Sequence, residues 1–434
     1  DLHVSFTIMS KTGNVEKRTL WRSNLGIMMI SSGLWRIGGR MTWPFWALYV
    51  LQLGGTAFHI GLIAAVSSVF GLIPAFFGGY LADAVGRKKM MYSMSFLLAF
   101  NTVTYLFAPS WEWLLLGRSM DAVFSGLRQP AFSALLADST RSENRAMSYG
   151  MWQAIPPVFG LLSPYAIGIL MDRIGVLPAQ RLAYVVLLVF STIGAFLRYR
   201  FLTETLPSES IEKVSPFTIV RETLGDFKET AKILTRPMWT LILMGILFMF
   251  GSSMGTIFMV TYATDDVLHL TSSEWGLINT ASILVGMVVS MPFAAIADRY
   301  GRLKIVLVSL FLTPLALLGF IYSEGFISTF IYYISLTILG AMGSVASQAL
   351  FIDFSPREHR GRISALMSVI GASSSFNFAM AGGGTIVGAL GNMIGGAIYS
   401  DISYSLPLFI MAGMIGLTAL IGAAFVREPQ QRED

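Results

Sequence analysis

Residues 79–89 read Gly79-Tyr-Leu-Ala-Asp83-Ala-Val-Gly86-Arg87-Lys88-Lys89, and 215 positions later the chain repeats the pattern as Ala294-Ala-Ile-Ala-Asp298-Arg-Tyr-Gly301-Arg302-Leu-Lys304. Each copy follows a long apolar segment that contains a proline, Pro74 or Pro292. The same offset aligns Gly61-Leu-Ile with Gly276-Leu-Ile, and Asp138, Glu143 and Arg145 with Asp353, Glu358 and Arg360. A repeat much longer than a solenoid unit predicts two related halves, each a bundle of helices.

The composition indicates an all-α protein that crosses a membrane many times. Of the 434 residues, 54% are hydrophobic and only 13% are charged, whereas a soluble domain carries about a quarter charged residues. Twelve apolar stretches reach the length of about 20 residues that a bilayer requires. They lie near residues 25–51, 58–82, 90–108, 113–137, 146–171, 180–202, 238–263, 273–297, 303–322, 326–352, 361–385 and 404–426.

The formal charge of +5 is distributed unevenly between the two sides of these spans. We assign 24 of the 30 lysines and arginines to one side, including two at the end of the sixth span, and only Arg173 and Arg181 to the other. The remaining four arginines lie within spans. This bias is the positive-inside rule, and it predicts a multi-pass protein of the plasma membrane with both termini in the cytoplasm. The excess charge therefore indicates no nucleic-acid partner.

The spans divide the chain into a cytoplasmic tail (1–24), a six-helix bundle (25–203), a cytoplasmic linker (204–237), a second six-helix bundle (238–426) and a short tail (427–434). Residues 1–24 contain no apolar region of a signal peptide. In the linker, Ser215-Pro216 is followed by apolar residues at spacings of three and four, which predicts an amphipathic surface helix. That helix either tethers the two bundles or regulates them.

The eleventh span differs from the fifth, its counterpart in the first half. From Arg145 to Gly168 is 23 residues, whereas Arg360 to Gly396 is 36. The additional residues fall in a stretch rich in glycine and serine, and glycine weakens a helix. We expect either a break in this helix between residues 371 and 392 or a helix that ends near 385 and continues as an extracytoplasmic segment.

The residue types argue against a metal site, a cofactor or an enzyme active site. The chain has no cysteine, and its four histidines are dispersed without ligand spacing. No pairing of nucleophile and base is visible either. We expect no cofactor, and we expect the partners to be a small-molecule solute, protons and the lipid bilayer, with the chain acting as a monomer.

The repeated loop resembles the motif G-x-L-A-D-x-x-G-R-K of the major facilitator superfamily. The first copy matches at Gly79, Leu81, Asp83, Gly86, Arg87 and Lys88, and the second keeps Asp298, Arg299, Gly301 and Arg302. Ala84 departs from the arginine that is common in the family. The resemblance covers the whole chain and implies two six-helix bundles around a central cavity, working by alternating access.

In that family setting the aspartates are candidate components of a cytoplasmic gate. An aspartate at a helix end caps a neighbouring helix or pairs with arginine. We expect Asp83 to pair with Arg145, and Asp298 with Arg360, in one conformation only; a static loop staple is the alternative. Asp138 and Asp353 lie at the same ends of their helices.

Weaker motifs resemble those of archaeal or bacterial drug:proton antiporters. The fourth span carries Arg118-Ser-Met-Asp121-Ala122, where that type usually has glutamine and glycine at the last two positions. The fifth span carries Ser163-Pro164-x-x-Ile167-Gly168, similar to G-P-x-x-G-G. The eleventh offers Gly391-Asn392-x-x-Gly395-Gly396. These matches imply export by antiport.

Arginines inside the spans are the candidate binding residues. Arg36 and Arg40 lie one turn apart in the first span, and Arg36 is roughly 16 Å past Leu25, near the midplane. An arginine at that depth costs at least about 2.5–3.5 kcal/mol, so we expect both to face a wet cavity, with Trp43 continuing the same stripe.

The fourth span adds a second set on one helical face: Arg118, Asp121, Ser125 and Arg128. Asp121 is the only acidic side chain that we place deep in the hydrocarbon region. It is therefore either the proton carrier or a structural partner of Arg118 or Arg40.

By the offset of 215, Gly251 and Gly255 are the counterparts of Arg36 and Arg40, so we expect a cavity that is cationic only in the first half. Its other side would present Asn279, Gln348 and Asn377. Four arginines against one aspartate favour an anionic or amphiphilic organic solute. The sequence thus predicts a secondary transporter, with proton-coupled efflux as the first interpretation. Proton-independent uptake or exchange and a non-transporting receptor are the alternatives.

Overall fold

The computed structural model describes residues 5–9, 15–19, 23–140, 145–206, 232, 234–355, 363 and 385–428. Within these ranges it describes all side chains except those of residues 5–9, 15–19, 73, 75, 76, 145 and 146.

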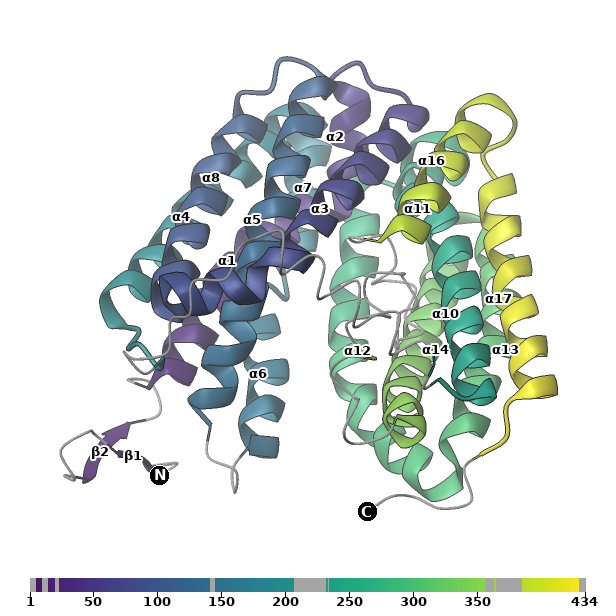
Figure 1. Cartoon of the computed structure of the whole chain (residues 1–434). Helices are drawn as coiled ribbons and strands as arrows, with labels where there is room; N and C mark the ends of the chain where they lie inside the picture. Colours follow the sequence, from purple (N-terminus) through teal and green to yellow (C-terminus); the bar gives the residue numbers. More distant parts are fainter. Residues whose placement is uncertain are drawn as a thin grey trace.

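The helices of these ranges form two lobes (Figure 1). The N-lobe contains α1 (Asn24–Thr42), η2 (Trp43–Phe45), α2 (Trp46–Gln52), α3 (Ala57–Val85), α4 (Arg87–Leu106), α5 (Trp111–Asp138), α6 (Arg145–Phe159), α7 (Ser163–Ile174) and α8 (Val176–Phe201). The C-lobe contains α10 (Arg236–Gly255), η4 (Thr256–Phe258), α11 (Met259–Thr261), the π-helical turn η5 (Tyr262–Asp266), α12 (Ser272–Tyr300), α13 (Arg302–Ile321), α14 (Gly325–Phe354), α16 (Ile386–Asp401) and α17 (Leu406–Phe425).

Each copy of the loop motif is a sharp turn between two long helices. Gly86 separates α3 from α4 with φ +98°, and Gly301 separates α12 from α13 with φ +107°. Only glycine adopts such angles without strain, so the motif glycines allow one helix to follow another directly. We call the end of the molecule that carries these turns the motif end, and the other the opposite end. The motif end is the lower end in Figure 1.

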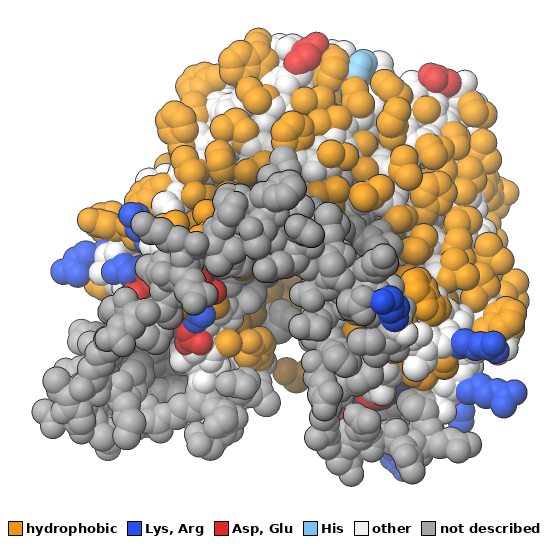
Figure 2. Space-filling model, in the orientation of Figure 1, with side chains coloured by type: hydrophobic (Ala, Val, Ile, Leu, Met, Phe, Trp, Pro, Cys, Tyr) orange, Lys and Arg blue, Asp and Glu red, His pale blue; other side chains and the backbone are white. Residues whose placement is uncertain are grey.

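Seven of the described helices or bent helices are long and apolar enough to cross a membrane, and α3 makes an eighth if its 55° bend is counted as one span. The remaining spans are shorter or more polar; α5, for example, contains Arg118, Asp121 and Arg128. On the face shown in Figure 2, hydrophobic side chains cover a broad band and most Lys and Arg side chains gather toward the motif end.

The eleventh predicted span, 361–385, lies outside the described residues except for Ile363 and Thr385. A helix does follow it: α16 begins at Ile386, and the extended Thr385 caps it by accepting from the Gly388 backbone N–H at 3.0 Å. A helix thus begins at Ile386, inside the window of residues 371–392, and the part of that window before Thr385 lies outside the described residues. Residues 386–401 are a bundle helix packed on α3 and α10, so the predicted end of this span is placed too early.

The N-terminal tail contains a short antiparallel hairpin, β1 (Ser5–Met9) with β2 (Val15–Thr19), in which Ser5 pairs with Thr19. The predicted linker helix from Ser215 lies outside the described residues.

The two halves repeat one tyrosine hydrogen bond, but at a sequence offset that differs from 215. Tyr49 on α2 donates its hydroxyl to the Tyr105 carbonyl at 2.7 Å, and Tyr262 does the same to the Ile321 carbonyl at 2.9 Å. Tyr49 and Tyr262 are 213 positions apart, not 215, and the 3-10 turns η2 and η4 follow the same offset. The second half gains two residues between Tyr262 and Ser272, where η5 forms a π turn.

This shift corrects the predicted counterparts of Arg36 and Arg40, which become Met249 and Ser253. A Cβ on Gly251 would lie 2.5 Å from Met414 Cβ, so Gly251 packs against α17 and does not face the centre. The asymmetry of charge persists, because neither Met249 nor Ser253 is basic.

The lobes meet near the opposite end along two seams, α3 with α16 and α7 with α12. A Cβ on Gly61 would lie 2.3 Å from the Asn392 carbonyl oxygen and 3.1 Å from Gly396 Cα. A Cβ on Gly276 would lie 2.3 Å from the Pro164 carbonyl oxygen. The repeated Gly61 and Gly276 are therefore the points where backbones of the two lobes touch, while the lobes diverge toward the motif end (Figure 1).

Candidate functional site

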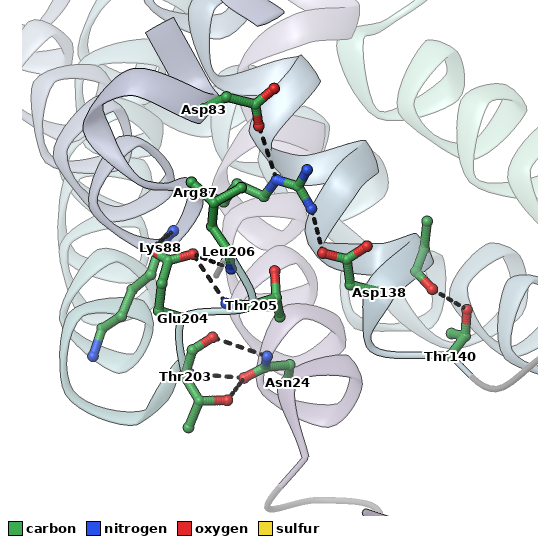
Figure 3. A network of polar contacts seen from close by, with 11 residues as sticks. Asn24, Asp83, Arg87, Lys88, Asp138, Thr140, Thr203, Glu204, Thr205 and Leu206 are labelled. Carbon is green, nitrogen blue, oxygen red and sulfur yellow. Dashed lines mark hydrogen bonds and ion pairs between the residues drawn. The ribbon is translucent and has the colours of Figure 1, made fainter. Parts of the chain in front are cut away.

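At the motif end, each motif arginine binds two aspartates of its own lobe. Arg87 donates from Nε to Asp83 Oδ1 at 3.1 Å and from Nη1 to Asp138 (Figure 3). Arg302 repeats this arrangement, with Asp298 at 2.9 Å and Asp353 at 2.6 Å. The two networks tie the start of α4 to α5 and the start of α13 to α14.

These pairs differ from the predicted latches. Asp83 and Asp298 each bind the motif arginine four residues later in the chain. The predicted partners are not described: Arg360 and the side chain of Arg145 lie outside the described residues. Gly79 and Arg299 lie outside these networks: a Cβ on Gly79 would meet open space, and the Arg299 guanidinium lies 5.5 Å from the centroid of the Tyr300 ring.

Two glutamates, which the sequence analysis did not identify, bind the backbone of the motif. Glu204, after α8, accepts from the Lys88 backbone N–H at 3.0 Å (Figure 3). Glu428, after α17, accepts from the Arg302 backbone N–H at 2.7 Å. Each carboxylate caps the first turn of a helix, where free N–H groups and the helix dipole favour negative charge. Both follow the last helix of a lobe, a repeated position that could have signalled them.

Four arginines lie inside the predicted spans of the N-lobe, Arg36 and Arg40 on α1 and Arg118 and Arg128 on α5, and we call this set the arginine cluster. Arg118 and Arg128 lie ten residues, roughly 15 Å, apart along α5. The Arg118 guanidinium lies over Trp43 at 4.6 Å and over Trp46 at 5.4 Å from the ring centroids. Arg40 interacts electrostatically with Arg36 and with Tyr333 of the C-lobe. Within the described part of the chain, none of the four forms an ion pair with a carboxylate, and the buried Nε of Arg118 has no hydrogen-bond partner.

Packing fixes the position of this cluster. A Cβ on Gly160, at the junction of α6 and α7, would lie 2.5 Å from the Arg36 carbonyl and 3.0 Å from Arg40 Cγ. On the other side, Pro74 of α3 fills the space beside Gly126 of α5, at 2.7 Å from its hypothetical Cβ. Each of the two helices that carry the arginines is thus packed closely on a neighbouring segment, α1 on the α6–α7 junction and α5 on α3.

Asp121 is held by α4 and not by an arginine. Its Oδ1 accepts from Asn101 Nδ2 and its Oδ2 from the Tyr105 hydroxyl, both at 2.7 Å. Tyr105 stacks on Tyr184 of α8 with centroids 5.1 Å apart. The nearby Arg118 and Arg128 act on the carboxyl through space. The predicted direct pair with Arg118 or Arg40 is therefore not formed in the described residues, and Asn101 and Tyr105 are site residues that the sequence did not reveal.

A fifth buried arginine corrects the charge assignment made from the sequence. Arg198, counted among the residues of the cytoplasmic side, is only 5% exposed. It donates to Ser31 at 2.9 Å, Ser95 at 2.7 Å and Ser32 at 2.9 Å, all hydroxyl oxygens. Arg128 lies close enough to interact with it electrostatically.

The two predicted polar residues of the C-lobe that the structure describes, Asn279 and Gln348, form hydrogen bonds within their own helices. Asn279 donates to the Trp275 carbonyl of its own helix at 2.9 Å, and the exposed Gln348 donates to Ser344 at 3.3 Å. Ser125 of the N-lobe likewise donates to the Asp121 carbonyl at 2.5 Å. Asn377 lies outside the described residues.

The motif residues of the fifth and eleventh spans form backbone contacts. Pro164 and Gly168 face α12, since a Cβ on Gly168 would lie 2.3 Å from the Ser272 carbonyl. Gly396 and Asn392 face α3 across the other seam. Gly391 and Gly395 instead face α10 within the C-lobe, at 2.6 Å from the Phe250 carbonyl and 2.4 Å from the Met254 carbonyl.

The seams and the arginine cluster are connected through η2. This 3-10 turn carries Trp43, which contacts Arg118, and Pro44, whose carbonyl accepts from the indole N–H of Trp275 on α12 at 3.3 Å. The residue that contacts Arg118 and the residue that contacts α12 are therefore adjacent in the chain, which couples the arginine cluster to the interface between the lobes.

Comparison with known proteins identifies the family to which this architecture belongs. The Major Facilitator Superfamily profile matches residues 28–379 and 256–434. An uncharacterized MFS-type transporter, YqjV of Bacillus subtilis (strain 168), is 24% identical over 394 residues, 90% of each chain. Multidrug resistance protein MdtG of Salmonella paratyphi B (strain ATCC BAA-1250 / SPB7) is 25% identical over 423 residues, 92% of this chain and 94% of its own.

Solved structures share the fold at low sequence identity. A peptide transporter POT in complex with sulfate has a TM-score of 0.68 at 13% identity, covering 98% of this chain and 96% of its own. The human organic anion transporter MFSD10 (TETRAN) has a TM-score of 0.64 at 15% identity, covering 93% and 100%. The chain therefore belongs to the major facilitator superfamily, and it is a multi-pass secondary transporter of small organic solutes, not an enzyme.

Proposed function

We propose that the chain carries an anionic or amphiphilic organic solute across the plasma membrane by alternating access, in exchange for protons. One observation supports this proposal: four guanidinium groups lie inside predicted spans of one lobe, and no carboxylate of the described residues is in ion-pair contact with them. Unpaired charges of this kind are costly in a bilayer and are typical of a substrate pathway. An anionic solute would supply the missing partner.

The roles of the cluster follow from its chemistry. Arg36, Arg40, Arg118 and Arg128 would bind the negative group, since guanidinium matches carboxylate and phosphate in a bidentate geometry. Trp43, 56% exposed beside Arg118, would contact the apolar part of the solute. Asn279, Gln348 and Asn377 remain candidates for the C-lobe side of the site.

Asp121 is the proposed proton carrier. It is the acidic side chain at the depth of the arginines, about 10 residues and roughly 15 Å along α5 from its start. Asn101 and Tyr105 hold its two oxygens toward α4, so the carboxyl remains separate from the guanidinium groups. A bound anionic solute would neutralise Arg118 and Arg128, which otherwise stabilise the charged carboxylate of Asp121, so binding of the solute would favour protonation of Asp121.

We place the motif end in the cytoplasm, as the positive-inside rule favours. The conformation described here, in which the two seams close the opposite end, would then be open toward the cytoplasm. The networks of Arg87 and Arg302 would form the two halves of a cytoplasmic gate.

The test is transport in proteoliposomes with an imposed pH gradient, using the parent protein and Asp121→Asn. We expect the variant to lose uptake driven by the gradient and to keep solute–solute counterflow, because the arginines remain. Asp401→Asn, which changes an exposed carboxyl at the end of α16, should behave as the parent.

Other results would replace parts of the proposal. Gradient-driven flux that survives in Asp121→Asn would exclude Asp121 as carrier. Flux in the parent that ignores the gradient would support the second candidate, uptake or exchange without protons.

A further inference from the structure

The two seams that close the opposite end are not chemically equivalent. At the α7–α12 seam, Asp172, one turn after Gly168, accepts from the backbone N–H groups of Ser272 at 2.9 Å and Ser273 at 3.0 Å. These are the first residues of the 29-residue helix α12. A carboxylate from the N-lobe thus caps a helix of the C-lobe.

The α3–α16 seam lacks this contact in the described residues. Each helix also has a capping box within its own lobe, Thr56 with His59 at α3 and Thr271 with Glu274 at α12, so these local caps do not distinguish the two seams. The residue of α16 that lies one turn after Gly396 is Ser400, and the neighbouring Asp401 is exposed. In the part of the chain that the structure describes, a carboxylate therefore joins the lobes at the α7–α12 seam and not at the α3–α16 seam.

We infer that Asp172 is an interlobe latch that stabilises the conformation closed at the opposite end and must release α12 when that end opens. Its carboxylate accepts from two N–H groups that have no partner within their own helix and lies at the positive end of the helix dipole, which favours negative charge. Because the contact joins the two lobes, it stabilises only the conformation in which α7 and α12 are in contact. This inference requires that the lobes alternate, as the proposed function states, but it is independent of solute and proton.

The test uses the absence of cysteine from the chain. Glu112→Cys on α5 and Glu324→Cys before α14, exposed residues of different lobes at the opposite end, accept spin labels for distance measurement by electron–electron double resonance. In Asp172→Ala, we expect the ratio of closed to open populations to fall roughly two- to thirtyfold, the range for loss of a helix cap. Asp401→Ala is the matched control and should leave the distances unchanged.

A second substitution removes the donor instead of the acceptor. Ser272→Pro deletes one N–H at the first position of a helix, where proline is tolerated, and Thr271 before it is already extended. We expect a smaller shift than in Asp172→Ala, and no further shift when the two are combined.

Distances in Asp172→Ala that equal those of the parent would overturn the latch, as would fully additive effects of Ser272→Pro and Asp172→Ala. If a variant loses transport while its label distances stay unchanged, the latch is refuted all the same. The loss of transport would then bear on the proposed solute site alone. Because Asp172 is exposed, none of these variants removes a core side chain.

Discussion

The substitution Gly276→Ala tests whether backbone contact at the α7–α12 seam closes the opposite end. The new methyl carbon would lie 2.3 Å from the Pro164 carbonyl oxygen and 3.0 Å from Tyr165 Cα, and ordinary contact begins at 3.4 Å. The nearest atoms belong to the backbone of α7, so no side chain can rotate away and the two helices must separate.

Overpacking of this kind costs about 1–3 kcal/mol, which corresponds to a change of roughly 5- to 150-fold in the closed-to-open ratio. The helix propensity gained from alanine is about 1 kcal/mol in either conformation and cancels from that ratio. Gly286→Ala on the same helix is the matched control, since its methyl would lie 3.7 Å from Thr337.

The assay is the interlobe distance between labels at positions 112 and 324, supported by labels at the motif end at Lys89→Cys and Lys304→Cys. We expect Gly276→Ala to lengthen the first distance and shorten the second, and Gly286→Ala to change neither. Equal distributions in the two alanine variants would refute the reasoning, because the steric contact would then not govern the conformation.

Three further predictions follow from single contacts. Gly86→Ala should lower the thermal unfolding temperature, because alanine at φ +98° is strained by about 1–2 kcal/mol. Trp275→Phe, which removes the hydrogen bond to Pro44, should increase the population open at the opposite end, measured by the same label distances. Arg118→Lys should weaken binding of an anionic solute in a titration although the charge is kept, because a lysine lacks the fork and the planar stacking on Trp43.

Much of the fold could be predicted from the sequence because the chain repeats its strongest signals. The glycine turns of the motif, the close-contact glycines at 61 and 276, and the arginines of the first and fourth spans are all visible as residue types at fixed spacing. The fold class and the transporter function are confirmed by the family match. Eleven of the twelve predicted spans coincide with described helices.

The failures have a common physical cause, which is that the missing information lies in tertiary contacts. Arg198 sits near the end of an apolar helix, where snorkelling to water is the usual outcome, and only the folded bundle brings three serine hydroxyls around it. The two residues added at η5 change the offset from 213 before this turn to 215 after it, and the repeated markers visible in the sequence, Gly61 onward, all lie after it. Asp172 resembles any exposed aspartate until α12 is placed against it.

The eleventh span shows a different limit. Its glycine- and serine-rich stretch has no hydrophobic period from which to place a helix. The start of α16 is set by one side chain, Thr385, through a single capping bond. The composition of this stretch therefore did not predict the helix that begins at Ile386, and the predicted break stays a prediction.

The most direct measurement of the central claim is a thermal-shift series on purified protein with anionic, neutral and cationic organic ligands. The account predicts that an anionic ligand raises the unfolding temperature of the parent and of Arg200→Ala, an exposed arginine outside the cluster, but not of Arg36→Ala. Stabilisation by cations alone, or equal stabilisation of Arg36→Ala by the anion, would contradict it.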